Sequence, residues 1–155
     1  MGQERGWRDL ALNPPGIGIT HEATRHRQAQ GLGADRGWQV GADGEFVVAD
    51  LLATLTAVSR PDRLRGRTSG WFVLHSVPLG DGQGQVHGDV DHLVPGPPGV
   101  VAINTKHHRG GRHVLDGEQL VLNGYRTVYM AKGRRAAQRV AAYLHATLTA
   151  AGLPE

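Results

Sequence analysis

Apolar residues recur at helical spacing in two segments of the chain, and these segments predict its main helices. Residues 43–57 read DGEFVVADLLATLTA, with apolar side chains three and four positions apart. Asp43 stands where the N-cap of this helix is expected. A second helix is predicted from about residue 132 to residue 151, because Val140, Leu144 and Leu148 form one apolar line.

Between these helices the pattern changes to short apolar and β-branched runs bounded by proline and glycine, which predicts strands. We expect strands at residues 71–77, 86–94 and 100–106. Pro78 is expected to end the first strand, and the Pro-Gly cluster at residues 95–99 to join the other two as a hairpin. Asn123-Gly124, within residues 119–130, is typical of a two-residue β-hairpin turn.

The first forty residues carry no such pattern. The sequence NPPG at residues 13–16 is a cluster of helix-breaking residues, and further glycines follow it up to Gly37. A segment without an apolar stripe has little to bury in a core. We therefore predict a disordered or weakly structured N-terminal tail over residues 1–40, in which residues 20–30 could form a short polar helix, and one domain over residues 41–151.

The composition excludes several classes of protein. The chain has no cysteine, which excludes disulfides, thiolate metal sites and cysteine nucleophiles. No apolar run approaches the length of a membrane span, and the N-terminus lacks the apolar core of a secretory signal. We therefore expect a cytoplasmic protein with no membrane partner.

Charge is distributed unevenly along the chain, whose net charge is +3. Residues 41–100 contain four arginines and seven acids, whereas residues 101–155 contain eight basic residues and three acids. An acidic middle followed by a basic last third suits a site that binds a cation and a polyanion side by side. Ordinary surface charge is the alternative interpretation.

Five polar residues fall where they can meet. Alternation along a strand points Asp89 and Asp91 to one face, and it places Asn104 and Lys106 together on the next strand. Two carboxylates this close repel each other unless a cation lies between them. Glu45 adds a carboxylate on the apolar face of the first helix, where it needs a cation or a partner. The alternative is that Glu45 only complements the helix dipole in the first turn.

These residues resemble the nuclease-related domain, NERD, a family of the PD-(D/E)xK nuclease superfamily. The resemblance covers about residues 41–148. It rests on Gly44-Glu45 at the helix start, Asp89-Val90-Asp91-His92, Gly96-Pro97, and the strand GVVAINTK at residues 99–106. It implies an α/β fold with a restriction-endonuclease-like mixed sheet flanked by helices. No strand pattern follows the second helix, so either the last core strand of that fold is missing or the core is completed in another way.

The resemblance also assigns roles to the five polar residues. Asp91 matches the acid that bridges the metal ion, Lys106 matches the lysine of the ExK motif, and Glu45 matches the helix glutamate. Asn104 stands where the family usually has Glu or Asp, so metal affinity is expected to fall and Asp89 to compensate as a ligand. The implied metal is Mg²⁺ or Mn²⁺, since hard cations prefer oxygen ligands.

Basic residues in the last third are candidates for a nucleic-acid-binding surface, because arginine holds phosphate oxygens through paired hydrogen bonds. The candidates are Arg109, Arg112, Arg134, Arg135 and Arg139. A solvated helix face is the alternative for them. His107, His108 and His113 match no zinc-site spacing and are expected in a polar loop. His92 points away from Asp91 and is expected to be packed and hydrogen-bonded.

Two functions remain open at this stage. The first is a Mg²⁺-dependent endonuclease or DNA-processing nuclease centred on Glu45, Asp91, Asn104 and Lys106. The second is a non-catalytic nucleic-acid-binding or interaction module that kept the nuclease fold, which the uncharged Asn104 favours. DNA as partner rests on the resemblance. We expect no small-molecule cofactor, and the oligomeric state stays open.

Overall fold

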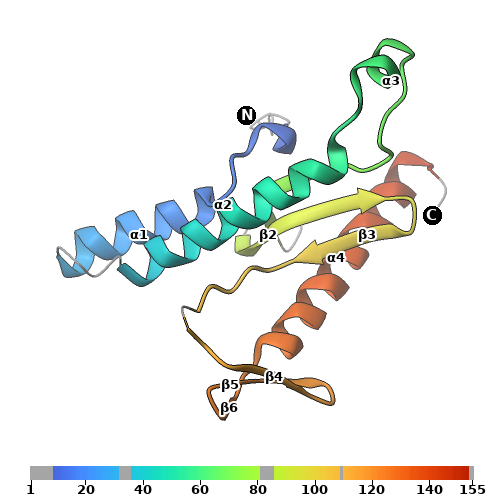
Figure 1. Ribbon diagram of the computed structural model, residues 1–155. Coiled ribbons are helices and arrows are strands. Elements are labelled where there is room, and N and C mark those ends of the chain that lie inside the picture. Colours follow the sequence, from blue (N-terminus) through green and yellow to red (C-terminus); the bar gives the residue numbers. More distant parts are fainter. Residues whose placement is uncertain (1–8, 32–35, 81–85, 109, 154–155) are drawn as a thin grey trace, which may run out of the picture.

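The computed structural model describes residues 9–31, 36–80, 86–108 and 110–153. These residues form helices and two three-stranded antiparallel sheets, of which one lies between α2 (Arg36–Thr56) and α4 (Tyr129–Ala151) and the other beside one end of α4 (Figure 1). Sheet A has the order β1-β2-β3, formed by Leu74–Gly80, Val86–Gly96 and Gly99–Ile103, and sheet B has the order β4-β5-β6, formed by His113–Asp116, Gln119–Leu122 and Tyr125–Arg126. The prediction of a mixed sheet is therefore wrong for the described strands, because each of them pairs antiparallel with its neighbour in sequence. Such short connections allow only antiparallel pairs.

Sheet A confirms the predicted hairpin and shifts the strand ends. Strands β2 and β3 pair from His92↔Ile103 to Gly96↔Gly99, so the Pro-Gly cluster forms the turn. Strand β1 begins three residues later than predicted and contains Pro78, which was expected to end it. Proline is tolerated there because β1 is an edge strand with no further ladder to complete. At the far end, Gly96 lies under the ring of Trp71, where a Cβ would overlap the indole.

Sheet B confirms the second predicted hairpin. Asn123 and Gly124 both have positive φ, 51° and 85°, as a two-residue turn of this hand requires. The Asn123 side chain also accepts a hydrogen bond from the Arg112 backbone N–H at 2.8 Å, which closes the start of β4 onto the turn. This hairpin lies beside the N-terminal half of helix α4, away from sheet A (Figure 1).

The small apolar core lies between sheet A and α4 (Tyr129–Ala151), which runs behind the sheet in Figure 1. Val90 and Leu93 of β2 and Val140 of α4 are buried together, and Leu144 packs against them. The predicted apolar line of this helix therefore faces the core. The helix begins three residues before its predicted start at residue 132.

Most of the described residues within the first forty are helical, which corrects the predicted disorder for residues 9–31 and 36–40. Residues 10–12 form a 3-10 turn, η1, and α1 (Ile17–Gln30) packs along α2 (Arg36–Thr56). The breaker cluster NPPG is the turn before α1, where Gly16 adopts the left-handed φ of 73°. Helix α2 starts seven residues before the predicted N-cap and includes Gly37, since packing between helices outweighs the roughly 1 kcal/mol cost of a helical glycine.

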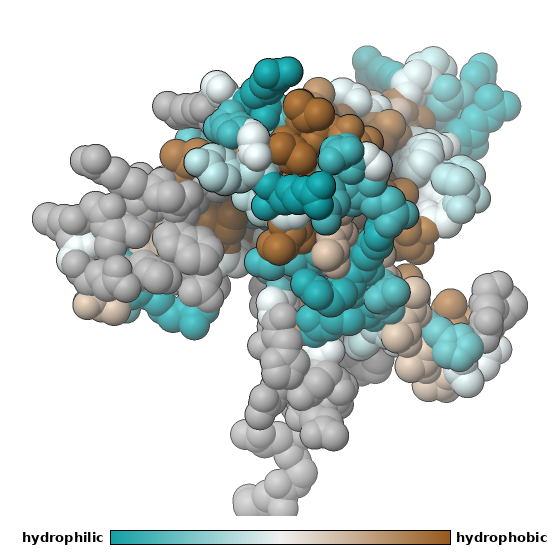
Figure 2. Space-filling model, turned by 90° about the horizontal axis from the view of Figure 1, so that it is seen from below, coloured by the Kyte–Doolittle hydropathy of each residue, from teal (hydrophilic) through white to brown (hydrophobic). Residues whose placement is uncertain are grey.

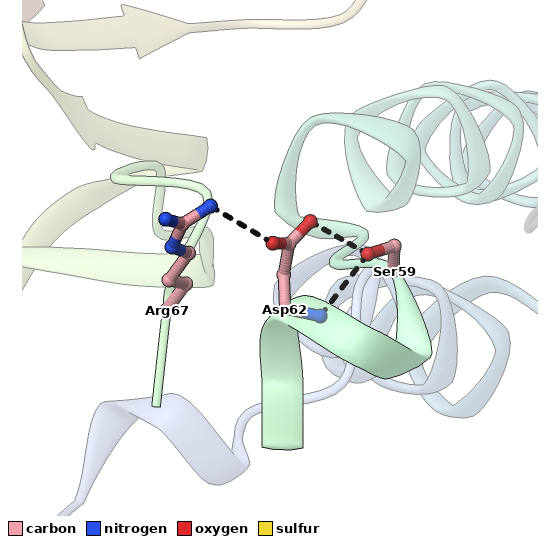
Figure 3. A network of polar contacts seen from close by, with 3 residues as sticks. All are labelled: Ser59, Asp62 and Arg67. Carbon is pink, nitrogen blue, oxygen red and sulfur yellow. Dashed lines mark hydrogen bonds and ion pairs between the residues drawn. The ribbon is translucent and has the colours of Figure 1, made fainter. Parts of the chain in front are cut away.

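Helix α3 (Arg60–Leu64) lies between α2 and β1. It is a local structure: the Ser59 hydroxyl accepts from the Asp62 N–H and donates to the Asp62 carboxylate at 2.6 Å (Figure 3). Arg67 pairs with the same carboxylate at 3.3 Å. Since all three groups are solvent-accessible, this network holds the turn and contributes little to global stability.

Hydrophobic and hydrophilic residues are mixed on the surface (Figure 2). Seen from below, hydrophobic residues form patches between hydrophilic ones (Figure 2). Several apolar side chains of α2, including Val47 and Leu51, are exposed. In the described part of the chain, every helix is too short or too polar to cross a membrane.

Candidate functional site

Glu45 is the most unusual acid of the structure. Its residue is only 2% exposed, and it lies ten residues into α2 rather than in the first turn. The alternative of a helix-dipole role is therefore wrong. The Gly16 backbone N–H donates to Glu45 Oε2 at 2.9 Å. Burial, followed by the charges of Asp91 and Asp89, raises the pKa of Glu45 to about 7 against the opposing effects of Gly16 and Lys106.

Asp91 lies in the middle of β2 and is 8% exposed. One carboxylate oxygen, Oδ2, accepts a hydrogen bond from the Thr105 backbone N–H, just beyond β3. Burial raises the pKa of Asp91, although Lys106 and the Thr105 N–H act in the opposite direction and Asp89 adds to the increase. These electrostatic couplings mean that Glu45, Asp89, Asp91 and Lys106 form one cluster, called the acid cluster below.

Asn104 and Lys106 follow β3 instead of lying within it, because the strand ends at Ile103. The strand alternation used to place them on one face therefore does not apply. Both side chains are exposed, and both line the same cleft with Asp89. The Lys106 ammonium group donates to the Thr105 carbonyl at 2.7 Å, which holds the lysine beside the residue that binds Asp91.

The N-terminal segment closes one side of the acid cluster. Besides the Gly16 contact with Glu45, Gly18 in the first turn of α1 lies against Asp89, so closely that a Cβ would overlap Asp89 Oδ2. Asn13 donates to the Ser76 carbonyl at 3.1 Å, which ties this segment to β1. The sequence pattern assigned no role to Gly16 and Gly18, since one makes its contact through the backbone N–H and the other through the absence of a side chain.

A cleft of about 910 Å³ opens beside the acid cluster, between sheet A and α4. Asp89, Asn104 and Lys106 line it on one side. The α4 residues that line it include Lys132, Arg134, Arg135 and Arg139, and Tyr129, Met130 and Leu120 add apolar surface. Arg134 pairs with Glu118 at 2.9 Å, and Arg139 donates to the Leu79 carbonyl at 2.9 Å. Three of the predicted phosphate-binding arginines therefore meet the acid cluster at one cleft.

Two of these cleft residues were missed from the sequence. Tyr129 was assigned to the strand before the helix, and Lys132 was taken only as the helix start. The positive charge of residues 101–155 was the one signal that pointed to Lys132. No sequence signal pointed to Tyr129, because its position at the cleft depends on where α4 begins.

Other predicted residues lie apart from the cleft. Arg112 lines a separate hollow on sheet B, so it lies apart from the predicted arginines of α4 that line the cleft. Arg109 lies outside the described residues. His107 Nδ1 donates to the Val40 carbonyl at 3.0 Å, and His108 Nε2 shares a hydrogen bond with the Tyr129 hydroxyl at 3.1 Å. These two histidines are thus engaged with protein groups.

His92 is fully buried, as expected, on the sheet face opposite Asp91. Its Nδ1 lies 2.8 Å from His75 Nδ1 in an edge-to-face pair, so one ring donates and the other accepts. Burial lowers the pKa of His92 to about 4, and the neighbouring His75 adds to this. Among the described residues, His92 Nε2 has no hydrogen-bond partner.

The donor chemistry of the acid cluster fits a hard divalent cation. Buried carboxylates with raised pKa values are destabilised by one another's charge, and a cation would relieve this. Among the residues that the structure describes, no three histidine, cysteine or acidic side chains are grouped tightly enough to hold a metal by themselves. Mg²⁺ suits such a site, since it keeps several waters and uses one or two carboxylates.

Comparison with known proteins gives one match. The model of the nuclease-related domain family, NERD, matches residues 40–153, from α2 to the end of α4. No curated protein and no solved structure matches the chain.

Proposed function

Because this chain belongs to the nuclease-related domain family, we propose that it is a metal-dependent nuclease that cleaves DNA phosphodiester bonds, with Asn104 in place of a catalytic acid. One observation carries the proposal. A buried acid cluster that suits a divalent cation lies beside a cleft lined with basic side chains of α4. A nuclease needs these two features together, because it binds a polyanion and neutralises charge at one of its phosphates.

Asp91 and Asn104, with Asp89, would hold Mg²⁺ or Mn²⁺ through oxygen atoms. The bound ion would polarise the phosphate and lower the pKa of an attacking water. Asn104 brings a carbonyl dipole but no charge, so it should hold the ion more weakly than a carboxylate. The Thr105 N–H fixes one oxygen of Asp91, which leaves the other available.

Lys106 and Glu45 would act on charge and protons. Lys106 faces the cleft, and its positive charge favours the ionised form of Asp91, which a metal ligand must have. It can also offset charge that develops on the phosphate. Glu45, with a pKa of about 7, can accept or release a proton near neutral pH. Its bond to the Gly16 N–H fixes the direction in which the carboxyl group points.

The α4 side of the cleft would bind the phosphates that flank the scissile bond. Lys132 and Arg135 are exposed there, and Arg139 is half-buried and oriented by the Leu79 carbonyl. Arg134 is paired with Glu118, so its contribution should be smaller. Each phosphate contact adds roughly 0.9 to the slope of log affinity against log salt for duplex DNA.

A specific observation favours the second function, a nucleic-acid-binding module without catalysis. Asn104 removes one charged ligand, and the described residues include no tight group of three metal-binding side chains. Such a module would keep the basic cleft and its salt-dependent binding. It would cut no substrate at any metal concentration.

The two functions differ in one experiment. Purified protein is incubated with supercoiled plasmid and with single-stranded DNA, in EDTA and across a series of Mg²⁺ and Mn²⁺ concentrations. We expect nicking that needs the metal and is abolished by Asp91→Asn. Asp50→Asn is the matched control, because Asp50 is an exposed acid of α2 outside the acid cluster. Salt-dependent binding without metal-dependent cleavage would replace the nuclease with the binding module.

A further inference from the structure

Tyr129 is an aromatic side chain that lines the cleft and has no role in metal binding. It is the first residue of α4 and is half-buried, and Met130 and Leu120 line the same cleft. The acid cluster and the basic residues of α4 leave these apolar lining residues unexplained. A ligand that only presents phosphates would gain nothing from them.

The Tyr129 ring is fixed in place by His108. The two rings are stacked, with centroids 5.7 Å apart and planes 22° apart, and His108 Nε2 bonds the tyrosine hydroxyl at 3.1 Å. His113 continues the row, with its ring centroid 6.1 Å from that of His108. A ring held on one side by a stacked partner loses little conformational freedom when a second flat group stacks on it.

Cationic side chains line the same cleft as this ring. Lys106 belongs to the acid cluster, and Lys132 lies about one helical turn beyond Tyr129 on α4. Proteins that bind unpaired nucleic acid combine these elements: cations track the backbone while aromatic rings stack with the bases. A base in an intact duplex has both faces covered by its neighbours and cannot use such a ring.

We propose that Tyr129, supported by His108, is a base-stacking subsite, and that the substrate has unpaired bases beside the scissile phosphate. This inference rests on the proposed nuclease function and narrows its substrate to single-stranded or locally opened DNA. Stacking on Tyr129 would hold the strand in the cleft that Lys106 and Asp89 of the acid cluster also line. It would also be tolerant of sequence, because every base has a flat face.

Binding to two strands of equal charge tests the inference. The probes are a labelled oligothymidylate of about eight nucleotides and an oligomer of the same length whose residues are all abasic, measured by fluorescence anisotropy in EDTA. We expect wild type to prefer the thymidylate, and Tyr129→Leu to lose affinity for it on the order of tenfold. Binding of the abasic strand should not change. Tyr129→Phe keeps the ring and should keep most of the preference.

The matched control is Tyr143→Leu, because Tyr143 lies on the same helix, is 60% exposed and does not line the cleft. Equal binding of both strands by wild type would overturn this inference alone. So would an equal loss on both strands in Tyr129→Leu, which would indicate a structural role. If Tyr129→Leu does not fold, the wild-type comparison still decides. Failure of wild type to bind either strand at low salt would overturn the proposed function as well.

Discussion

Replacing Glu45 by glutamine should stabilise the metal-free protein at pH 8. The pKa of Glu45 is raised from 4.5 to about 7, so the folded chain prefers the protonated form more strongly than the unfolded chain does. The stability contributed by this preference is fully present below pH 4.5 and is lost as pH rises through about 7. The difference between 4.5 and 7 corresponds to roughly 3 kcal/mol of unfolding free energy.

Glutamine is neutral at every pH and can still accept the hydrogen bond from the Gly16 N–H. It therefore removes the cost of the charge and leaves the Gly16 N–H with an acceptor. We expect the free energy of unfolding of Glu45→Gln to exceed that of wild type by about 1–3 kcal/mol at pH 8. The lower part of this range is expected if the neighbouring carboxylates, rather than Glu45, take up protons in wild type. The gain should fall to roughly 0.4 kcal/mol at pH 4.5, where Glu45 is protonated in the folded chain and half-protonated in the unfolded chain.

Urea unfolding at pH 4.5 and pH 8, in EDTA and then in Mg²⁺, measures both effects. The metal should stabilise wild type more than Glu45→Gln at pH 8, because the charged carboxylate gains a counter-ion. Asp50→Asn serves as the control and should change stability little at either pH, since Asp50 is exposed. Equal stability of Glu45→Gln and wild type at pH 8 in EDTA would refute the reasoning, because Glu45 would then carry no uncompensated charge.

Three further substitutions test other parts of the structure. Asn104→Glu should lower the Mg²⁺ concentration needed for binding and plasmid nicking, because a carboxylate adds a charged ligand; calorimetry and a Mg²⁺ series measure this. Gly18→Ala should displace the Asp89 carboxylate and weaken metal binding on the order of tenfold, with a nearly unchanged melting temperature. Gly96→Ala should destabilise the fold by about 1–3 kcal/mol in urea unfolding, because the new methyl group overlaps the Trp71 ring.

Matched glycines serve as controls. Gly41→Ala disturbs the contact between α1 and α2, at 3.1 Å from Ile19 Cδ1, but no carboxylate, so metal affinity should stay at the wild-type value. A loss as large as that of Gly18→Ala would assign the effect to helix packing. Gly133→Ala meets nothing within 4 Å and should stabilise α4 by about 0.5–1 kcal/mol. A stable Gly96→Ala would mean that Trp71 is free to move. No gain in metal affinity from Asn104→Glu would exclude Asn104 as a ligand position.

The sequence alone determined the elements whose signal is local. Both hairpins followed from their turn residues, because Asn123-Gly124 and the Pro-Gly cluster at residues 95–99 restrict backbone φ directly. Helix α4 followed from the spacing of Val140 and Leu144, which reflects one buried face. The family followed from short motifs in β2 and the segment after β3, where chemistry restricts residue type more than packing does.

Only the tertiary structure decided how the N-terminal segment and the cleft are arranged. Residues 9–31 have no apolar stripe, and they are held by backbone groups and close glycine contacts that leave no periodic signal. The path of the loop after β3 brings Asn104 and Lys106 together at the cleft. The sequence also predicted that they meet, but from the alternation of side chains along a strand that ends before them. The raised pKa of Glu45 depends on burial and on charges from β2, 44 or more residues away in the chain. Such long-range desolvation is a property of the folded chain, because no local pattern specifies which carboxylates will share one dry site.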